Sequence, residues 1–120
     1  MRFEFTGHGP VMPVIVLDRT QDALPLARAL VAGGVRLLEV TLRSPAALPG
    51  IEAIARELPA AVVGAGTVLS GADARAARAA GARFAVSPGY SPALGAACRC
   101  CPGWPRPARS CRRAATVMRC

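Results

Sequence analysis

The stretch Leu37-Leu38-Glu39-Val40-Thr41-Leu42-Arg43 places a carboxylate among apolar neighbours and a guanidinium at its exit. On a strand, alternate side chains face opposite sides of the sheet. The stretch then divides into an apolar set, Leu38, Val40 and Leu42, and a mixed set, Leu37, Glu39, Thr41 and Arg43. A buried charge is costly unless it is paired or used. Two interpretations stay open: a structural ion pair, or an acid/base group beside an anion-binding arginine.

Other polar residues stand where further expected strands end. Thr67 follows the apolar run 61–66, and Ser87 and Pro88 follow the run 84–86. In parallel α/β folds, the carboxyl edge of the sheet is where ligands bind and catalysis takes place. These residues are therefore expected to converge on one rim, although Thr67 or Ser87 alone would be interpreted as a turn or capping residue.

Each polar group of this rim has a chemistry that suits its type. The planar guanidinium of Arg43 suits a carboxylate or a phosphate. Partial burial of Glu39 would raise its pKa for proton transfer, whereas Arg43 would lower that pKa, so the direction is open. Gly64-Ala65-Gly66-Thr67 predicts a glycine-rich turn with backbone N–H groups near an anion, although this motif alone is more typical of a plain turn.

The elements that must position these groups alternate along the chain. Continuous apolar runs predict strands buried on both faces, and apolar residues at helical spacing predict the helices between them. The expected strands are 11–17, 36–41, 61–67 and 84–87, and the expected helices are 20–32, 44–58 and 70–80. This order implies right-handed parallel crossovers, as in half of a (β/α)8 barrel or in a doubly wound sheet. A complete barrel needs roughly 200–250 residues, more than the 120 present.

Specific residues mark the helix ends and faces. Thr20 or Asp22 is expected to cap the first helix, and Ser70 with Asp73 resembles a capping box for the third. For the second helix, Gly50 is expected to weaken its start. That helix is predicted to bury Leu48, Ile51, Ala55 and Leu58 and to pair Glu52 with Arg56 on its wet side.

Charge and cysteine are concentrated in the last residues of the chain. Residues 1–97 hold all seven acidic residues and nine of the fifteen arginines, a net +2, whereas residues 98–120 hold six arginines and all five cysteines, a net +6. The body is therefore not expected to bind nucleic acid. No run reaches the roughly 18 apolar residues of a membrane span, and the start lacks a secretory h-region, so a cytoplasmic protein is expected. The only histidine, His8, is expected in an exposed loop and cannot form a metal site alone.

Several ordered segments resemble the bacterial 2-keto-3-deoxy-6-phosphogluconate (2-dehydro-3-deoxy-phosphogluconate) and 4-hydroxy-2-oxoglutarate aldolases. These segments are Val11–Val16, Ala29–Gly34, Leu38–Arg43, Val63–Val68 and Ala85–Gly89. The resemblance implies a TIM barrel, usually a cytoplasmic homotrimer. It implies a class I lyase of the Entner-Doudoroff pathway that cleaves its substrate to pyruvate and glyceraldehyde 3-phosphate without a metal or cofactor. By resemblance, Glu39 transfers protons, Arg43 and Thr67 hold the pyruvate carboxylate and neighbouring groups, and Pro88 lines the site.

One departure from the family pattern concerns the nucleophile. The family uses a lysine on a later strand, in a Phe-Lys-Phe-Phe-Pro-like motif, to form the Schiff base, and this chain contains no lysine. The phosphate-binding glycine and serine loops of the last strands are missing too. We therefore expect residues 1–97 to form about four β/α units of a partial barrel, truncated and inactive alone. Two alternatives remain open: a non-catalytic half-barrel that binds small carboxylates or polyanions, and one half of a split aldolase.

Residues 98–120 show neither strand alternation nor a helical stripe. They are expected to be irregular, with a weak zinc-site pattern and arginines that are either solvated or bound to polyanions. Their composition of Arg, Pro, Cys, Ala and Trp is typical of G+C-rich DNA read in a wrong frame, and we hypothesise a frameshift near Ala97. The strand edges beside the first and fourth strands are expected to be open.

Overall fold

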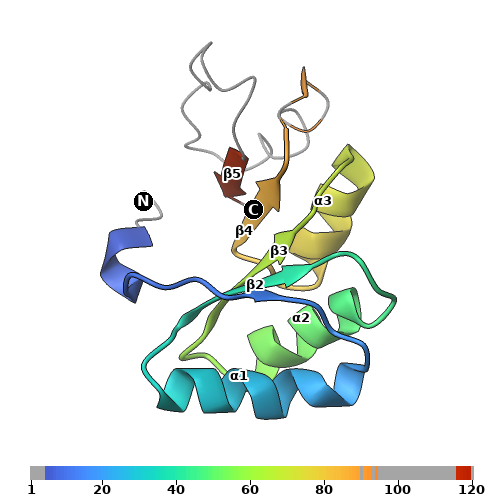
Figure 1. Ribbon diagram of the computed structural model, residues 1–120. Coiled ribbons are helices and arrows are strands. Elements are labelled where there is room, and N and C mark those ends of the chain that lie inside the picture. The colour runs from blue at the N-terminus through green and yellow to red at the C-terminus, as the bar shows by residue number, and fades with distance from the viewer. Residues whose placement is uncertain (1–4, 90, 93, 95–115, 120) are drawn as a thin grey trace.

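The computed structural model describes residues 5–89, 91–92, 94 and 116–119 of the chain. Four parallel strands lie in chain order, and a fifth runs antiparallel beside the fourth (Figure 1). They are β1 (Val14–Ile15), β2 (Leu37–Thr41), β3 (Val62–Gly66), β4 (Phe84–Ser87) and β5 (Thr116–Arg119). The predicted parallel sheet is thereby confirmed, and the carboxyl ends of β1 to β4 share one edge.

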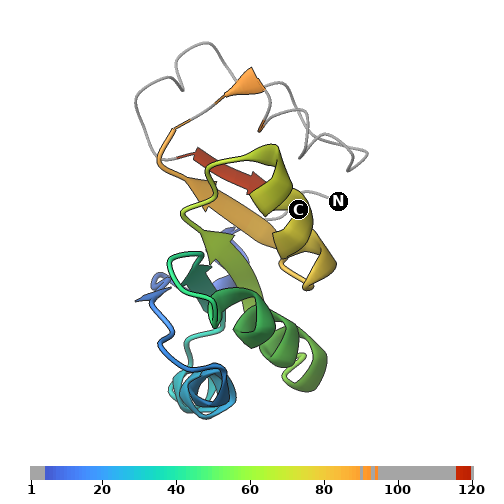
Figure 2. The ribbon, with the colours of Figure 1, turned by 90° about the vertical axis from the view of Figure 1, so that its right-hand side faces the viewer.

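The helices between the parallel strands pack on one face of the sheet. They are α1 (Ala23–Ala32), α2 (Ala47–Glu57) and α3 (Gly71–Ala79), with short 3-10 helices η1 (Phe5–His8) and η2 (Thr20–Asp22) before them. Figure 2 shows this layering from the side. A doubly wound sheet would carry helices on both faces, so sequential strands with helices on one face match part of a (β/α)8 barrel. No helix of the described residues is long and apolar enough to cross a membrane.

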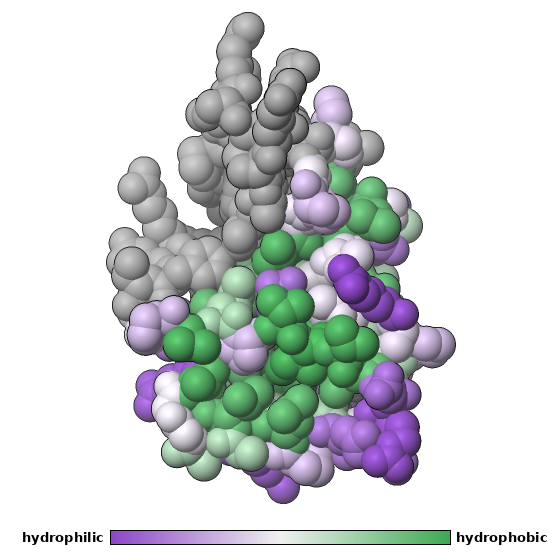
Figure 3. Space-filling model, in the orientation of Figure 1, coloured by the Kyte–Doolittle hydropathy of each residue, from purple (hydrophilic) through white to green (hydrophobic). Residues whose placement is uncertain are grey.

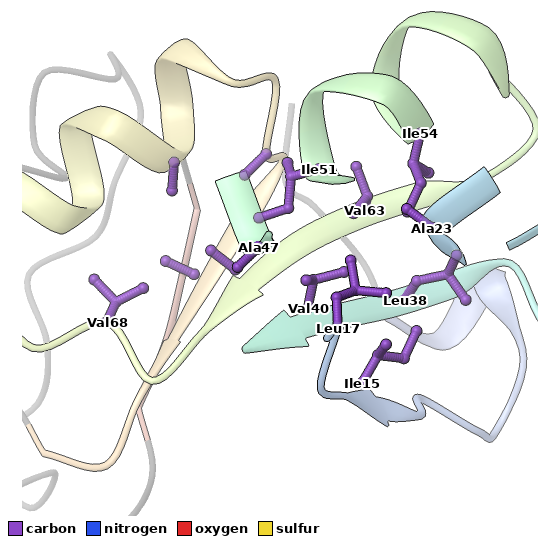
Figure 4. Close-up of a cluster of buried hydrophobic side chains, with 14 of the residues drawn as sticks. Ile15, Leu17, Ala23, Leu38, Val40, Ala47, Ile51, Ile54, Val63 and Val68 are labelled. Carbon is purple, nitrogen blue, oxygen red and sulfur yellow. The ribbon is translucent and has the colours of Figure 1, made fainter. Parts of the chain in front are cut away.

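A hydrophobic core fills the space between sheet and helices (Figure 4). Leu38 and Val40 of β2 face it, as the alternation of the strand predicted, and both are fully buried. Ile51 and Ile54 of α2 meet them there. Each buried aliphatic side chain contributes about 1.5–3 kcal/mol to stability relative to exposure. This burial keeps Leu38 and Val40 against the core, so Glu39 lies on the opposite face of β2.

The ends of α1 and α3 show which caps form. Ser70 accepts a hydrogen bond from the Asp73 N–H at 3.1 Å, and Asp73 accepts in return from the Ser70 N–H, which confirms the capping box. Asp22 precedes α1 but makes no capping bond; it forms an exposed ion pair with Arg19 instead. Gly34, just after α1, adopts φ +90°, a conformation that favours glycine.

The sequence prediction for α2 was partly wrong. Its fully buried residues are Ala47, Gly50, Ile51 and Ile54, whereas Leu48, Ala55 and Leu58 are only partly buried. Arg56 pairs with its neighbour Glu57 at 3.0 Å rather than with Glu52. The helix begins at Ala47, later than Ser44-Pro45 suggested.

Two further corrections concern the chain ends. Residues 116–119 form β5 along β4, so the edge of β4 is covered, although the sequence predicted an irregular tail and an open edge there. The expected properties of residues 98–115, including disorder, zinc binding and polyanion binding, lie outside the described residues. At the other end, His8 closes η1 and is half-buried rather than exposed in a loop.

The β1 end of the sheet carries an apolar surface. Val11, Val14 and Val16 are each more than half exposed, at 55%, 64% and 54%. Figure 3 shows apolar side chains gathered on the face that β1 crosses, with hydrophilic side chains at its margin. Within the described strands β1 is the last of the sheet on this side, as expected for an open edge.

Candidate functional site

Glu39 lies in the middle of β2, on the sheet face opposite the core. Its neighbours in register are Val14 of β1 and Gly64 of β3. The residue is 6% exposed, and no described residue donates a hydrogen bond or forms an ion pair with its carboxylate. Burial raises the pKa of the Glu39 carboxyl above its ordinary value. The direction that the sequence left open is therefore upward, and desolvation is the cause.

Two glycines of β3 give the large side chains of this face their room. A Cβ on Gly64 would lie 2.5 Å from Cδ2 of Phe84 and closer still to two other atoms of that ring. A Cβ on Gly66 would lie 2.8 Å from Cδ of Glu39. Both glycines belong to β3, whose last residue is Gly66, so the chain bends at Thr67 and the predicted turn does not begin at Gly64. Their role is to allow close approach, for which glycine in a strand interior is typical.

Arg43 lies beyond the end of β2 and is exposed. Within the described residues it forms no ion pair, either with Glu39 or with another carboxylate. The loop that carries it is held at the rim, because the Leu42 N–H donates to the Gly66 carbonyl at 2.9 Å and the Ser44 hydroxyl donates to the Leu17 carbonyl. The guanidinium thus stands at the carboxyl edge with its donors available to a ligand.

Thr67 follows β3 directly and has a strained backbone. Its φ is +56°, and it is the only described residue other than glycine with a positive φ. A β-branched residue rarely adopts this conformation, which costs of order 1–3 kcal/mol and is typical of functional sites. The next residue, Val68, is fully buried, and its N–H donates to the Val86 carbonyl at 3.1 Å. These anchors hold Thr67, which is half-buried, at the rim.

The Ser87-Pro88-Gly89 turn closes β4. The Ser87 hydroxyl donates to the Gly89 carbonyl at 2.6 Å and is buried. Since Ala85 pairs with Ala65 on the core face, Ser87 shares that face rather than the face of Glu39. The Ser87 hydroxyl therefore stabilises the turn, whereas Pro88 is exposed at the rim.

The parallel strands thus place Arg43, Thr67 and Pro88 at one edge, and Glu39, in the middle of β2, extends its carboxyl over Gly66 toward that edge. Thr41 has a structural part there, because its hydroxyl donates to the Ile15 carbonyl at 3.1 Å and ties β2 to β1. The contribution that sequence reasoning missed is that of Gly66, although a glycine inside a strand could have indicated it. A carboxyl of raised pKa accepts a proton more readily than an ordinary carboxylate, and a free guanidinium can bind a carboxylate or phosphate.

Comparison with known proteins finds relatives of this chain. The profile of the family described as "Aldolase: KDPG and KHG aldolase" matches residues 4–102. The KHG/KDPG aldolase of Escherichia coli K12 is 57% identical over 86 residues, which cover 72% of this chain and 40% of that protein. The 2-dehydro-3-deoxy-phosphogluconate aldolase of Treponema pallidum is 49% identical over 96 residues, covering 80% of this chain and 46% of that protein.

A solved structure has the same fold in this region. The KDPG aldolase of Legionella pneumophila, with pyruvate captured at low pH as a covalent carbinolamine intermediate, superposes with a TM-score of 0.75 and 46% identity. The match covers 79% of this chain and 46% of that one. This chain spans less than half the length of the curated relatives it matches. On the extent of the profile match, it belongs to the KDPG and KHG aldolase family.

Proposed function

We propose that this chain supplies the keto-acid-binding and proton-transferring part of a class I aldolase acting on 2-keto-3-deoxy-6-phosphogluconate. A lysine from outside these 120 residues completes the site, because the sequence contains none. The observation that carries the proposal is the Glu39 carboxyl, which is buried, unpaired within the described residues and raised in pKa at the carboxyl edge of a parallel sheet.

The chemistry begins at the keto carbon of the substrate. An amine attacks this carbon to give a carbinolamine, which loses water to form an iminium, and the iminium accepts the electron pair when the C3–C4 bond breaks. A base takes the proton of the C4 hydroxyl, and glyceraldehyde 3-phosphate leaves. The enamine then takes a proton at C3, and water releases pyruvate and the amine. Support for this course comes from the Legionella relative, which was captured with pyruvate as a carbinolamine.

Glu39 is the group to which we assign both proton transfers. A carboxyl whose pKa is raised by burial accepts a proton from an alcohol more readily than an ordinary carboxylate and can return it in the next step. Because no described residue occupies its oxygens, both are available to substrate or to an ordered water. The role agrees with the one that the family resemblance implies for this position.

Arg43 and Thr67 are assigned to the carboxylate of the substrate. The Arg43 guanidinium lies free at the rim and can bind a carboxylate with two parallel hydrogen bonds. Thr67 offers a hydroxyl from a backbone conformation that the rim holds in place. Pro88, exposed at the end of β4, would line the same side of the site.

The test is a reconstitution. The 120-residue chain is mixed with a second polypeptide, the part of the Escherichia coli relative that this chain does not cover, and pyruvate release from 2-keto-3-deoxy-6-phosphogluconate is measured. We call this mixture the reconstituted aldolase. We expect activity only in the mixture, with no turnover from the 120-residue chain alone, since it has no amine side chain to form the imine.

Matched variants separate the roles of the two polypeptides. Glu39→Gln keeps the shape of the side chain and removes its proton transfer, so it should lower kcat by a factor of roughly 10²–10⁴. Borohydride should still trap a pyruvate adduct on the second polypeptide. If the Glu39→Gln mixture turns over at the unmodified rate, Glu39 is not the proton-transferring group and the proposal fails.

Assembly and location complete the proposal. The family resemblance implies a cytoplasmic homotrimer, and we propose the same for the reconstituted aldolase. Size-exclusion chromatography with light scattering tests this, because three copies of each polypeptide should elute together. A stable species with one copy of each would contradict the trimer.

A further inference from the structure

The side chain of Glu39 lies across Gly66 of the neighbouring strand. A Cβ on Gly66 would lie 2.8 Å from Cδ and 2.9 Å from Cγ of Glu39, and closer still to Oε1. Approaches under 3.0 Å are essentially never seen for real Cβ atoms. The space that any other residue would fill at position 66 is therefore occupied by the carboxyl group.

The strand register shows that this placement is diagonal. Glu39 pairs with Gly64, while Gly66 pairs with Thr41 nearer the carboxyl edge. The space over Gly64 is filled by the ring of Phe84, which is fully buried. Because the Phe84 ring fills the space over Gly64, the carboxyl of Glu39 extends over Gly66 instead. Gly66 lies nearer the rim than Gly64 and directly precedes Thr67.

We propose that Gly66 is a positioning residue. Because it has no side chain, it leaves a space over the end of β3, which we call the seat, and this space holds the Glu39 carboxyl and fixes its direction toward the carboxyl edge. Gly66 is not required by its backbone, since the described glycines with positive φ are Gly9, Gly34 and Gly81. Its requirement is steric. Gly66 is the last residue of β3, and glycine in a strand is typical of a site that another group approaches closely, here the Glu39 carboxyl.

The same seat explains the burial of the carboxyl. The positions around Glu39 on the adjoining strands are Val14, Gly64 and Gly66, none of which is ionisable. Arg43 lies exposed beyond the strand and makes no ion pair. The carboxyl is thus held against β3 by packing alone, and displacing it from Gly66 would return it to water. The consequence for catalysis rests on the proposed function, whereas the seat can be measured in the 120-residue chain by itself.

A double-mutant cycle tests the seat through stability. Urea unfolding midpoints are compared for the unmodified chain, Gly66→Ala, Glu39→Ala and the double variant. We expect the effect of Gly66→Ala on the midpoint to differ between the two backgrounds, because the added methyl meets the Glu39 carboxyl only where that side chain is present. Gly64→Ala is the matched control: its loss should be the same in both backgrounds, since its added methyl meets Phe84.

An equal loss for Gly66→Ala in both backgrounds would overturn the proposal. If Gly66→Ala does not fold, the cycle still decides, because the double variant should fold and a double variant that also fails contradicts the seat. The comparison does not require catalytic activity, so it stands apart from the reconstitution.

A titration gives a readout that a purely structural role would not change. The pKa of Glu39 is measured from its carboxyl ¹³C shift in the labelled chain. We expect Gly66→Ala to move this pKa down toward the ordinary value of 4.5, whereas Gly33→Ala, whose methyl would meet only backbone oxygens at 3.4 and 3.6 Å, should leave it unchanged. An unmoved pKa in a folded Gly66→Ala chain would contradict the seat.

The two proposals fail in different ways. Were the cycle and the titration to behave as expected while Glu39→Gln left the reconstituted aldolase fully active, the seat would stand and the assigned role of Glu39 would fall. If the seat tests fail but Glu39→Gln removes turnover, Glu39 keeps its role and another feature positions it. In the reconstituted aldolase, Gly66→Ala should lower kcat more than it changes KM.

Discussion

Glu39 lies within β2 and Arg43 lies just beyond its end, and these two charged residues do not form an ion pair. Glu39 is 6% exposed inside β2, whereas Arg43 lies beyond the strand in solvent, and within the described residues neither forms an ion pair. This excludes the structural ion pair that the sequence left open. A buried carboxyl without a partner lowers stability when ionised, so its retention calls for a use.

That relationship predicts a pH-dependent effect of Glu39→Gln on stability. The pKa of Glu39 is raised above 4.5 in the folded chain, so the folded state holds the proton more tightly than the unfolded state. The stability that this proton contributes is present below the unfolded pKa and is lost as the pH rises through the folded pKa. We therefore expect Glu39→Gln to raise the free energy of unfolding at neutral pH and to have little effect at acid pH, as measured by urea unfolding across the pH range.

The matched control is Glu52→Gln on the exposed side of α2. Glu52 makes no ion pair within the described residues, so this change should alter the free energy of unfolding at neutral pH by no more than about 0.5 kcal/mol. A Glu39→Gln chain that is less stable than the unmodified chain at neutral pH would contradict the burial argument.

Much of the fold could be predicted from local patterns. β4 has the predicted bounds, Phe84–Ser87, and α1 ends at the predicted Ala32, because buried strands have continuous apolar runs and glycine marks helix ends. β5 could not be predicted, because its pairing with β4 is a long-range contact that no local pattern of the sequence shows. The buried residues of α2 were only partly predicted, because apolar residues on two adjoining faces of the helix fit the same spacing.

The placement of the candidate residues on the sheet was predictable from the sequence, but their geometry was not. The face of Glu39 followed from alternation along the strand, and the shared rim followed from parallel order. The direction of its pKa could not be predicted, since it depends on whether Arg43 turns toward it. The seat at Gly66 depends on the register between β2 and β3, and the left-handed backbone of Thr67 depends on contacts at the rim.

Gly50 provides a second prediction, in which local propensity and packing disagree in sign. Helix propensity alone favours Gly50→Ala by about 0.5–1 kcal/mol. In the folded chain a methyl at this position would clash with Cδ1 of Leu17 and lie 3.3 Å from the Cβ of Ala23. Both neighbours are core residues, so we expect a net loss of about 1–3 kcal/mol in the free energy of unfolding.

Thermal or urea unfolding of Gly50→Ala beside Gly33→Ala measures this effect. Gly33 ends α1, and a methyl there would meet only backbone oxygens at 3.4 and 3.6 Å, so its replacement should change stability by a few tenths of a kcal/mol. A Gly50→Ala chain more stable than the unmodified one would show that Leu17 can move aside at no cost.

The helix caps give a third prediction. Ser70 bonds the Asp73 N–H at 3.1 Å at the start of α3, so Ser70→Ala should lower the free energy of unfolding by about 1 kcal/mol. Asp22 precedes α1 without a capping bond and makes only an exposed pair with Arg19, so Asp22→Ala should cost a few tenths of a kcal/mol. Urea unfolding of the two variants compares them, and equal losses would mean that the capping box contributes nothing of its own.

Thr67 carries the fourth prediction, a trade of stability against binding. Its φ of +56° costs a β-branched residue of order 1–3 kcal/mol, whereas glycine in the unfolded chain is more flexible by about 0.4–1 kcal/mol. Thr67→Gly should therefore stabilise the chain by up to about 2.6 kcal/mol, the largest difference between these two effects. Under the proposed function the same change removes a hydroxyl from the substrate carboxylate, so KM of the reconstituted aldolase should rise while the stability of the chain rises as well.

Thr20→Gly in η2 separates the strain from a general effect of glycine. Thr20 has no positive φ, so glycine there relieves nothing and should destabilise the chain. If Thr67→Gly also destabilises it, the hydroxyl or methyl of Thr67 makes contacts worth more than the strain. If it stabilises the chain and leaves KM unchanged, the strained backbone serves the rim rather than the substrate. Only a rise in both stability and KM supports the view that the strain is maintained for binding, because strain without a use would be removed by this single substitution.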